Sequence, residues 1–186
     1  MSWKKITVGI DEAGRGPLAG PMIIGAVAGI SPRLLRGIRD SKKLTERARE
    51  RWYRILRKNA ICRFISVPPS HIDSYGLSRV TKKAIARLLK KFPITLELVL
   101  LDGGIYAPPS YRQRTIIKGD EKIPLIAAAS IIAKVTRDRK MKRLHKKYPR
   151  YNFAVHKGYG TLAHRKAILA YGLSDIHRKS FCTKLI

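Results

Sequence analysis

Residues 123–134, IPLIAAASIIAK, are almost all small or apolar, and they open a segment that continues with basic residues to Tyr148. A helix that is apolar on every side is normally buried. The sequence therefore predicts a long helix over residues 123–148 whose first half packs at the centre of the domain. The apolar stretch is too short to cross a bilayer, so we expect no membrane segment.

Other patterns predict a sheet around that helix. Short runs rich in β-branched residues favour strands, and runs with a period of about 3.6 residues favour helices. Strands are expected at 5–10, 22–30, 61–67, 95–101 and 115–117, and further helices at 45–58, 78–91 and 162–171. This mixture indicates an α/β domain built on one sheet. A chain of 186 residues suits a single domain.

The chain is very basic, with 40 Lys and Arg against 12 Asp and Glu and a formal net charge of +28. Such self-repulsion is typical of proteins that bind polyanions. Nucleic acid is the expected partner, because neutralised phosphates release counterions. We expect the basic faces at 79–91 and 140–147 to contact the duplex backbone. Charge alone does not separate an enzyme from a basic structural protein that binds RNA or DNA.

The two cysteines, Cys62 and Cys182, lie far apart in the sequence. This spacing suits neither a zinc site nor a disulfide framework, so both are expected to be free thiols in a reducing compartment. Residues 1–6 lack the apolar run of a signal peptide. The sequence therefore favours a cytoplasmic protein.

Most of the carboxylates have a structural explanation. Glu46 and Glu50 suit the positive end of a helix dipole. Asp138 lies among basic residues, which indicates a surface ion pair. The other acids placed in this class are Asp40, Asp73, Glu97, Glu121 and Asp175.

Four carboxylates differ from these by their position. Asp11 and Glu12 follow an apolar strand and precede a glycine-rich turn, and Asp102 ends another apolar strand. Asp120 is expected to close the short strand before the apolar helix. Binding sites in open α/β sheets gather beyond the carboxyl ends of strands. If the strands before Asp11 and Asp102 are parallel neighbours, these two side chains meet at one end of the sheet.

Carboxylates held close together raise one another's pKa values. A divalent cation removes that repulsion, and hard oxygen ligands suit Mg²⁺ or Mn²⁺. We therefore expect one or two of these ions at Asp11, Glu12, Asp102 and Asp120, where they could activate a water at a phosphodiester. Each residue alone is also explained by a turn or a helix cap, and for Asp120 the cap is as good an explanation.

The segment 9–21, GIDEAGRGPLAGP, resembles the signature of ribonuclease HII. Further matching segments follow in order: 40–44 (DSKKL), 101–103 (LDG), 118–120 (KGD), 127–138 (AAASIIAKVTRD), 156–161 (HKGYGT) and 177–181 (HRKSF). The resemblance implies an RNase H-like fold, an α/β architecture with a mixed five-stranded sheet flanked by helices and with extra C-terminal helices. On this basis we expect residues 1–148 to form the catalytic core and 149–186 a helical extension packed on it as one compact unit.

The resemblance also implies an activity. Ribonuclease HII hydrolyses the RNA strand of RNA/DNA hybrids and cuts on the 5′ side of single ribonucleotides in duplex DNA, leaving 3′-hydroxyl and 5′-phosphate ends. It implies that Asp11, Glu12, Asp102 and Asp120 are the catalytic, metal-binding set. We expect a monomer that acts on RNA/DNA hybrid and on ribonucleotide-containing duplex DNA.

Substrate contacts follow from the same resemblance. The run Gly14-Arg15-Gly16 matches a turn whose backbone contacts the ribose 2′-hydroxyl, the group that distinguishes RNA from DNA. Tyr159 matches a tyrosine that packs against the sugar after the RNA–DNA junction, although ordinary packing also explains a lone tyrosine. Lys42 and Lys43 are expected phosphate contacts. Ser130 and His156 lie in matching segments and receive no role.

Two alternatives stay open at this point. Another nuclease or integrase on the same fold would cut all-DNA duplex as well. A non-catalytic basic protein would explain the charge but leave the placement of Asp11, Glu12 and Asp102 unexplained. One departure from the family pattern, residues 72–77 (IDSYGL) in place of a common Asn-containing stretch, touches no expected catalytic position.

Overall fold

The computed structural model describes residues 6–38, 44–183 and 185. Its centre is a five-stranded sheet in the order β3-β2-β1-β4-β5. The strands are β1 (Ile6–Ala13), β2 (Met22–Ala28), β3 (Ile61–Val67), β4 (Leu96–Asp102) and β5 (Gln113–Ile116). β2 is antiparallel to β1 and β3, whereas β4 is parallel to β1 and β5. The expected mixed five-stranded sheet is confirmed.

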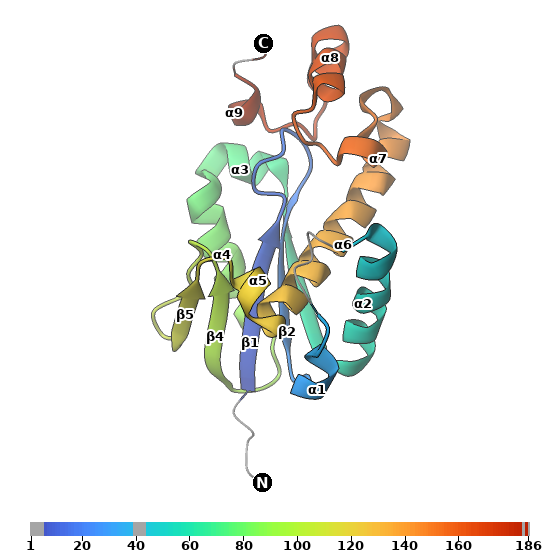
Figure 1. Cartoon of the computed structure of the whole chain (residues 1–186). Coiled ribbons are helices and arrows are strands. Elements are labelled where there is room, and N and C mark those ends of the chain that lie inside the picture. Colours follow the sequence, from blue (N-terminus) through green and yellow to red (C-terminus); the bar gives the residue numbers. More distant parts are fainter. Residues whose placement is uncertain (1–5, 39–43, 184, 186) are drawn as a thin grey trace.

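Helices cover both faces of this sheet (Figure 1). α4 packs on one face, and α6 packs on the other, where α2 lies beside it. The longer helices are α2 (Glu46–Asn59), α4 (Leu77–Leu89), α6 (Pro124–Lys147) and α8 (Leu162–Tyr171), and all four were expected. The extra C-terminal helices implied by the resemblance are present, but no short helix had an expected range. The short helices are α1 (Pro32–Leu35), α3 (Pro69–Tyr75), α5 (Gly119–Lys122), η1 (Pro149–Tyr151), α7 (Phe153–His156) and α9 (Lys179–Cys182). Segments of less than two turns carry too little periodicity to be recognised.

Two of the boundaries that differ from the sequence-based expectation concern the site. β1 does not stop before its acids but continues to Ala13, because its pairing with β2 places Asp11 opposite Gly25. Asp120 does not close the fifth strand, which ends at Ile116, but lies in α5. Lys118 has a φ of 55°, a left-handed conformation that turns the chain out of the strand direction before this helix.

Glycines in the sheet allow α6 to approach it closely. A Cβ on Gly9 would lie 2.4 Å from the carbonyl oxygen of Leu125, and one on Gly25 would lie 2.7 Å from that of Ala129. Both carbonyls belong to α6, whose apolar half is buried as expected. The backbone of α6 therefore lies directly on β1 and β2.

We expect Gly9→Ala to lower the free energy of unfolding by about 1–3 kcal/mol, because the added methyl would push α6 off the sheet. Urea unfolding measures this change. Gly104→Ala is the matched control, since a Cβ there would meet nothing within 4 Å. Equal midpoints for the two variants would contradict the close packing of α6 on β1.

The basic half of α6 is more buried than the sequence suggests. Asp138 was expected in a surface ion pair, but it is only 8% exposed and pairs with Lys134, with 3.0 Å between Nζ and Oδ1. The neighbouring Arg137 is fully buried. The ion pair is present, but its expected surface position is wrong, because the C-terminal segments cover this side of the helix. A local charge pattern does not reveal such a cover.

Those C-terminal segments form a third apolar cluster, which includes Ala19, Met141, Phe153 and Ile168. Ala19 belongs to the loop between β1 and β2, so the end of the chain packs on this loop. The division of the chain at residue 148 stays a prediction. Among the described residues, no helix has the length and apolar character needed to cross a membrane.

Three histidines are buried inside the C-terminal segments. Nε2 of His164 lies 3.1 Å from Nε2 of His177, and the ring of His156 stacks on that of His164 with 4.4 Å between centroids. Burial lowers the pKa of all three, and that of His164 falls to about 4. We call His156, His164 and His177 the histidine cluster. Cys62 and Cys182, elsewhere in the core, are free thiols as expected.

Candidate metal centre and cleft

Asp11 and Asp102 lie at the same end of the sheet. β1 and β4 are parallel neighbours, with Ile10 opposite Leu101 in the register. Each aspartate follows one of these paired residues, so their side chains emerge side by side. The prediction that the two carboxylates meet is confirmed.

Asp120 joins them from α5. The N–H of Gly119 donates a 2.6 Å hydrogen bond to Oδ1 of Asp102, which fixes the start of α5 against the end of β4. A Cβ at Gly119 would lie 2.7 Å from Cδ1 of Ile126 and 3.3 Å from Oδ1 of Asp102, so a side chain here would force its neighbours to move. Glycine here therefore lets α5 carry Asp120 up to the sheet.

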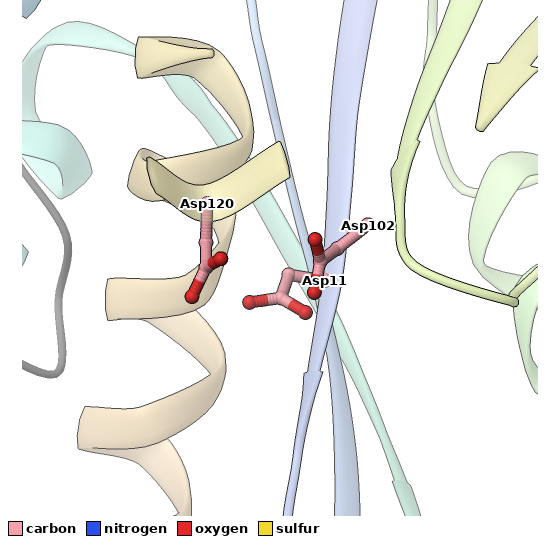
Figure 2. A group of neighbouring side chains, drawn as sticks. All are labelled: Asp11, Asp102 and Asp120. Atoms are coloured by element: carbon pink, nitrogen blue, oxygen red, sulfur yellow. The ribbon is translucent and has the colours of Figure 1, made fainter. Parts of the chain in front are cut away.

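The three aspartates form one compact group. One carboxylate oxygen from each of Asp11, Asp102 and Asp120 lies within 4.8 Å of the others. Figure 2 shows the three side chains converging from β1, the end of β4 and α5. The three aspartates are far apart in the sequence. They meet because the sheet and α6 place their backbones around a common point.

The group is electrostatically strained without a cation. Burial raises the pKa of Asp11 well above its usual value, and the neighbouring charges of Glu12 and Asp102 raise it further. A hydrogen bond with Ser130 acts in the opposite direction. Hard oxygen ligands at this spacing suit a divalent cation such as Mg²⁺ or Mn²⁺, and its charge would relieve the repulsion. The residues present therefore fit the expected metal.

Glu12 lies beside this group in the same cleft, and its place in the metal-binding set stays a prediction. It follows Asp11 on the same strand, and successive side chains of a strand point to opposite faces. Its Oε1 lies 3.5 Å from Nη1 of Arg15, and its N–H donates to Oδ1 of Asp11 at 2.7 Å. Glu12 is thus a neighbour of the three-aspartate group.

A cleft of about 520 Å³ opens beside the aspartates. Its walls include Asp11, Glu12 and Asp102 together with the 14–16 loop, as expected, and also Tyr159. Tyr159 is 44% exposed although it lies in the C-terminal part of the chain. Asp120, which is only 2% exposed, is not among the residues that line the cleft. Lys42 and Lys43, the expected phosphate contacts, fall outside the described residues.

Four further residues line the cleft without having been assigned to it: Ala13, Arg49, Ser130 and Lys134. Ser130 and Lys134 are one turn apart on α6, so they face the same way. Their place in the segment 127–138 was the signal that could have indicated them. Arg49, on α2, carried no such signal. His156 does not reach the cleft and instead binds the carbonyl of Tyr151 through Nε2 at 2.6 Å.

Comparison with known proteins agrees with this arrangement. The family model for ribonuclease HII matches residues 8–184. A curated ribonuclease HII from Coxiella burnetii (strain Dugway 5J108-111) is 42% identical over 179 residues, which cover 95% of this chain and 88% of the relative. One from Bacillus thuringiensis (strain Al Hakam) is 47% identical over 174 residues, 93% of this chain and 67% of the relative.

Solved structures show the same fold. RNase HII of Archaeoglobus fulgidus, from a complex with PCNA, has a TM-score of 0.81 and 29% identity, with 93% of each chain covered. Ribonuclease H2 of Pyrococcus horikoshii OT3 has a TM-score of 0.80 and 28% identity, with 97% of this chain and 96% of that chain covered. These matches decide for an enzyme over a non-catalytic basic protein. The chain belongs to the ribonuclease HII family and is a ribonuclease H that acts on RNA paired with DNA.

Proposed function

We propose that this enzyme cuts the RNA strand of RNA/DNA hybrids and also cuts on the 5′ side of a single ribonucleotide in duplex DNA, leaving 3′-hydroxyl and 5′-phosphate ends. The observation that supports the proposal most directly is the convergence of Asp11, Asp102 and Asp120 beside the 14–16 loop. Three carboxylates that suit a cation thus lie next to the backbone of residues 14–16, which a ribose can approach closely.

In this proposal Asp11, Asp102 and Asp120 bind one or two divalent ions, and Glu12 completes the ligand set from the edge of the cleft. The cation, when bound, supplies a more acidic water and charge stabilisation at the phosphodiester. The aspartates fix its position through backbones that are themselves held by the sheet. Asp102 is further fixed by the N–H of Gly119. Ser130 restrains the Asp11 carboxylate from the side of α6.

In this proposal, the residues of the cleft outside the carboxylate group select a ribonucleotide over a deoxyribonucleotide. The backbone of Gly14, Arg15 and Gly16 contacts the 2′-hydroxyl, and lack of a Cβ at the glycines permits this approach. Tyr159 packs against the next sugar. Lys42 and Lys43 contact phosphates. The exposed Lys and Arg side chains of α4 and of the last turns of α6 also contact phosphates. We also propose that the enzyme is a cytoplasmic monomer with residues 1–148 as its catalytic core.

The test is cleavage of three matched duplexes: RNA/DNA hybrid, DNA with one ribonucleotide, and DNA alone. We expect products from the first two only, in Mg²⁺ or Mn²⁺, with a single cut 5′ of the lone ribonucleotide when products are sized. Chelator should remove all cleavage. If DNA alone is cut equally well, the chain is instead a general nuclease on the same fold. Full activity in excess chelator would exclude the metal centre.

Binding should depend steeply on salt. With several phosphates contacted, affinity for duplex is expected to fall by about 1,000-fold between roughly 50 and 200 mM salt. Fluorescence anisotropy in Ca²⁺, chosen to limit cleavage, measures it. The slope should be the same with and without a ribonucleotide, because phosphate contacts do not sense the 2′-hydroxyl. A flat salt dependence would contradict the role of the basic faces.

A further inference from the structure

The loop between β1 and β2 is fixed from behind by a buried arginine. The guanidinium of Arg178, which is fully buried, donates to the carbonyl of Gly14 at 2.6 Å and to that of Arg15 at 2.8 Å. It also donates to the carbonyl of Gly20, from Nη2 at 2.9 Å and from Nε at 3.1 Å. One side chain near the end of the chain thus bonds three peptide groups of this loop.

These bonds determine where the amides of the loop point. In a trans peptide, the carbonyl of one residue and the N–H of the next point in opposite directions, and the described residues contain no cis peptide bond. With the carbonyls of Gly14 and Arg15 turned toward Arg178, the N–H groups of Arg15 and Gly16 point away from it. Both residues line the cleft, whereas Arg178 does not.

Those two N–H groups are available to a ligand. Within residues 6–38 and 44–183 neither has a hydrogen-bond acceptor. A carbonyl that accepts a bond from a charged donor is polarised, and this strengthens the N–H of the same peptide as a donor. Burial and the nearby Arg137 lower the pKa of Arg178, but only to about 10, so its charge remains at neutral pH.

A second arginine connects the same loop to Tyr159. The side chain of Arg137 donates to the carbonyls of Pro21 at 3.0 Å and Lys157 at 2.9 Å. Its guanidinium carbon lies 5.5 Å from the centre of the Tyr159 ring. Arg137 is therefore a buried residue that contacts both the loop and Tyr159.

We propose that Arg178 is a positioning residue for ribonucleotide recognition: by binding the carbonyls of Gly14 and Arg15 from behind, it aims the N–H groups of Arg15 and Gly16 at the ribose 2′-hydroxyl. This inference rests on the proposed function, in which the 14–16 loop contacts that hydroxyl. Arg178 itself touches no substrate. Its effect is on the choice between ribonucleotide and deoxyribonucleotide, and it leaves the binding of the DNA backbone unchanged.

Arg178→Lys tests the idea, because lysine keeps the charge but its single Nζ lacks the fork that reaches all three carbonyls. Binding is measured in Ca²⁺ to duplex DNA with and without one ribonucleotide. We expect the preference for the ribonucleotide to fall by roughly tenfold, the effect of losing well-oriented hydrogen bonds, with affinity for all-DNA duplex unchanged. Arg150→Lys is the matched control, an exposed arginine of the same C-terminal part.

The outcomes separate the two proposals. If the wild type binds both duplexes equally, the proposed contact between the 14–16 loop and the 2′-hydroxyl fails, and the inference fails with it. If the wild type has the preference and Arg178→Lys keeps it in full, the role of Arg178 fails while the function stands. A variant that weakens binding to both duplexes equally would show a structural role only, and would also overturn the inference.

Amide hydrogen exchange on the wild type gives a second test, which remains valid if Arg178→Lys does not fold. The N–H groups of Arg15 and Gly16 should exchange quickly in the free protein and become protected by ribonucleotide-containing duplex in Ca²⁺. All-DNA duplex should not protect them. Equal protection by both duplexes, or protection in the free protein, would overturn the proposal.

Discussion

Asp11→Asn is expected to lose cleavage by at least about 1,000-fold, because removal of a proposed metal ligand forfeits several kcal/mol of transition-state stabilisation. The same change should raise the unfolding midpoint in metal-free buffer. Burial and the charge of Glu12 disfavour the ionised Asp11 in the folded chain, and asparagine removes this penalty with little change in shape. Duplex binding should stay close to that of the wild type.

Initial rates of cleavage and thermal unfolding with and without Mn²⁺ measure the two effects. Mn²⁺ should raise the unfolding temperature of the wild type by binding the folded state alone, and it should raise that of Asp11→Asn much less. Glu97→Gln is the control, since Glu97 is an exposed acid on the neighbouring strand β4. An active Asp11→Asn variant, or one with the full response to Mn²⁺, would exclude Asp11 as a ligand.

Acid should unfold this protein through its histidine cluster. The unfolded chain binds protons as pH falls below 6.5, whereas folded His164 resists protonation down to about 4. A histidine with a lowered folded pKa therefore stabilises the fold fully above 6.5 and loses this contribution as pH falls toward 4. For His164 alone, the loss between pH 7.5 and pH 5 is about 2 kcal/mol, and His156 and His177 shift in the same direction.

The hydrogen bonds explain why the cluster stays neutral. His164 Nδ1 donates to the carbonyl of Tyr159 at 2.9 Å, which leaves its Nε2 to accept the proton of His177 at 3.1 Å. His177 Nδ1 in turn accepts from the N–H of Ser174 at 2.9 Å. A proton added to His164 Nε2 would point at the N–H of His177, and one added to His177 Nδ1 would point at the N–H of Ser174. Each ring therefore has a single tautomer that satisfies its neighbours.

Urea unfolding at several pH values above 5 checks this prediction, in a range where few carboxylates titrate. His164→Gln should be less stable at pH 7.5 but should depend less on pH than the wild type. His71→Gln, at an exposed position, should match the wild type throughout. A wild type equally stable at pH 5 and pH 7.5 would contradict the assignment.

The end of the sheet that carries Asp11 and Asp102 could be predicted because its signals are local. An apolar run that ends in Asp11 and another that ends in Asp102 indicate strands with carboxylates at one edge, and parallel pairing brings them together. The small residues of α6 indicated part of the reason why this helix packs closely on the sheet. Glycine at positions 9 and 25, which lets the helix backbone contact the sheet, becomes meaningful only once the partner is known.

The buried arginines could not be predicted in the same way. Arg137 and Arg178 each lie in a basic stretch, and such stretches are typical of exposed faces. Both are fully buried because several carbonyls of the loop after β1 are left without partners in the sheet. That need arises from the tertiary structure alone. The sequence marked the segment of Arg178 only through a family match, HRKSF, which gave no reason for the arginine.

The bonds between the β1–β2 loop and the end of the chain have a consequence for protein synthesis. Gly20 donates to the carbonyl of Ile176, and Gly14 accepts from Arg178. On the ribosome, the early loop emerges long before these partners are translated. A nascent chain can therefore assemble its sheet and gather its aspartates while the loop carbonyls still lack their buried donor. Residues 176–178 support a loop that is synthesised much earlier, so the substrate cleft is finished only after this later segment has left the ribosome.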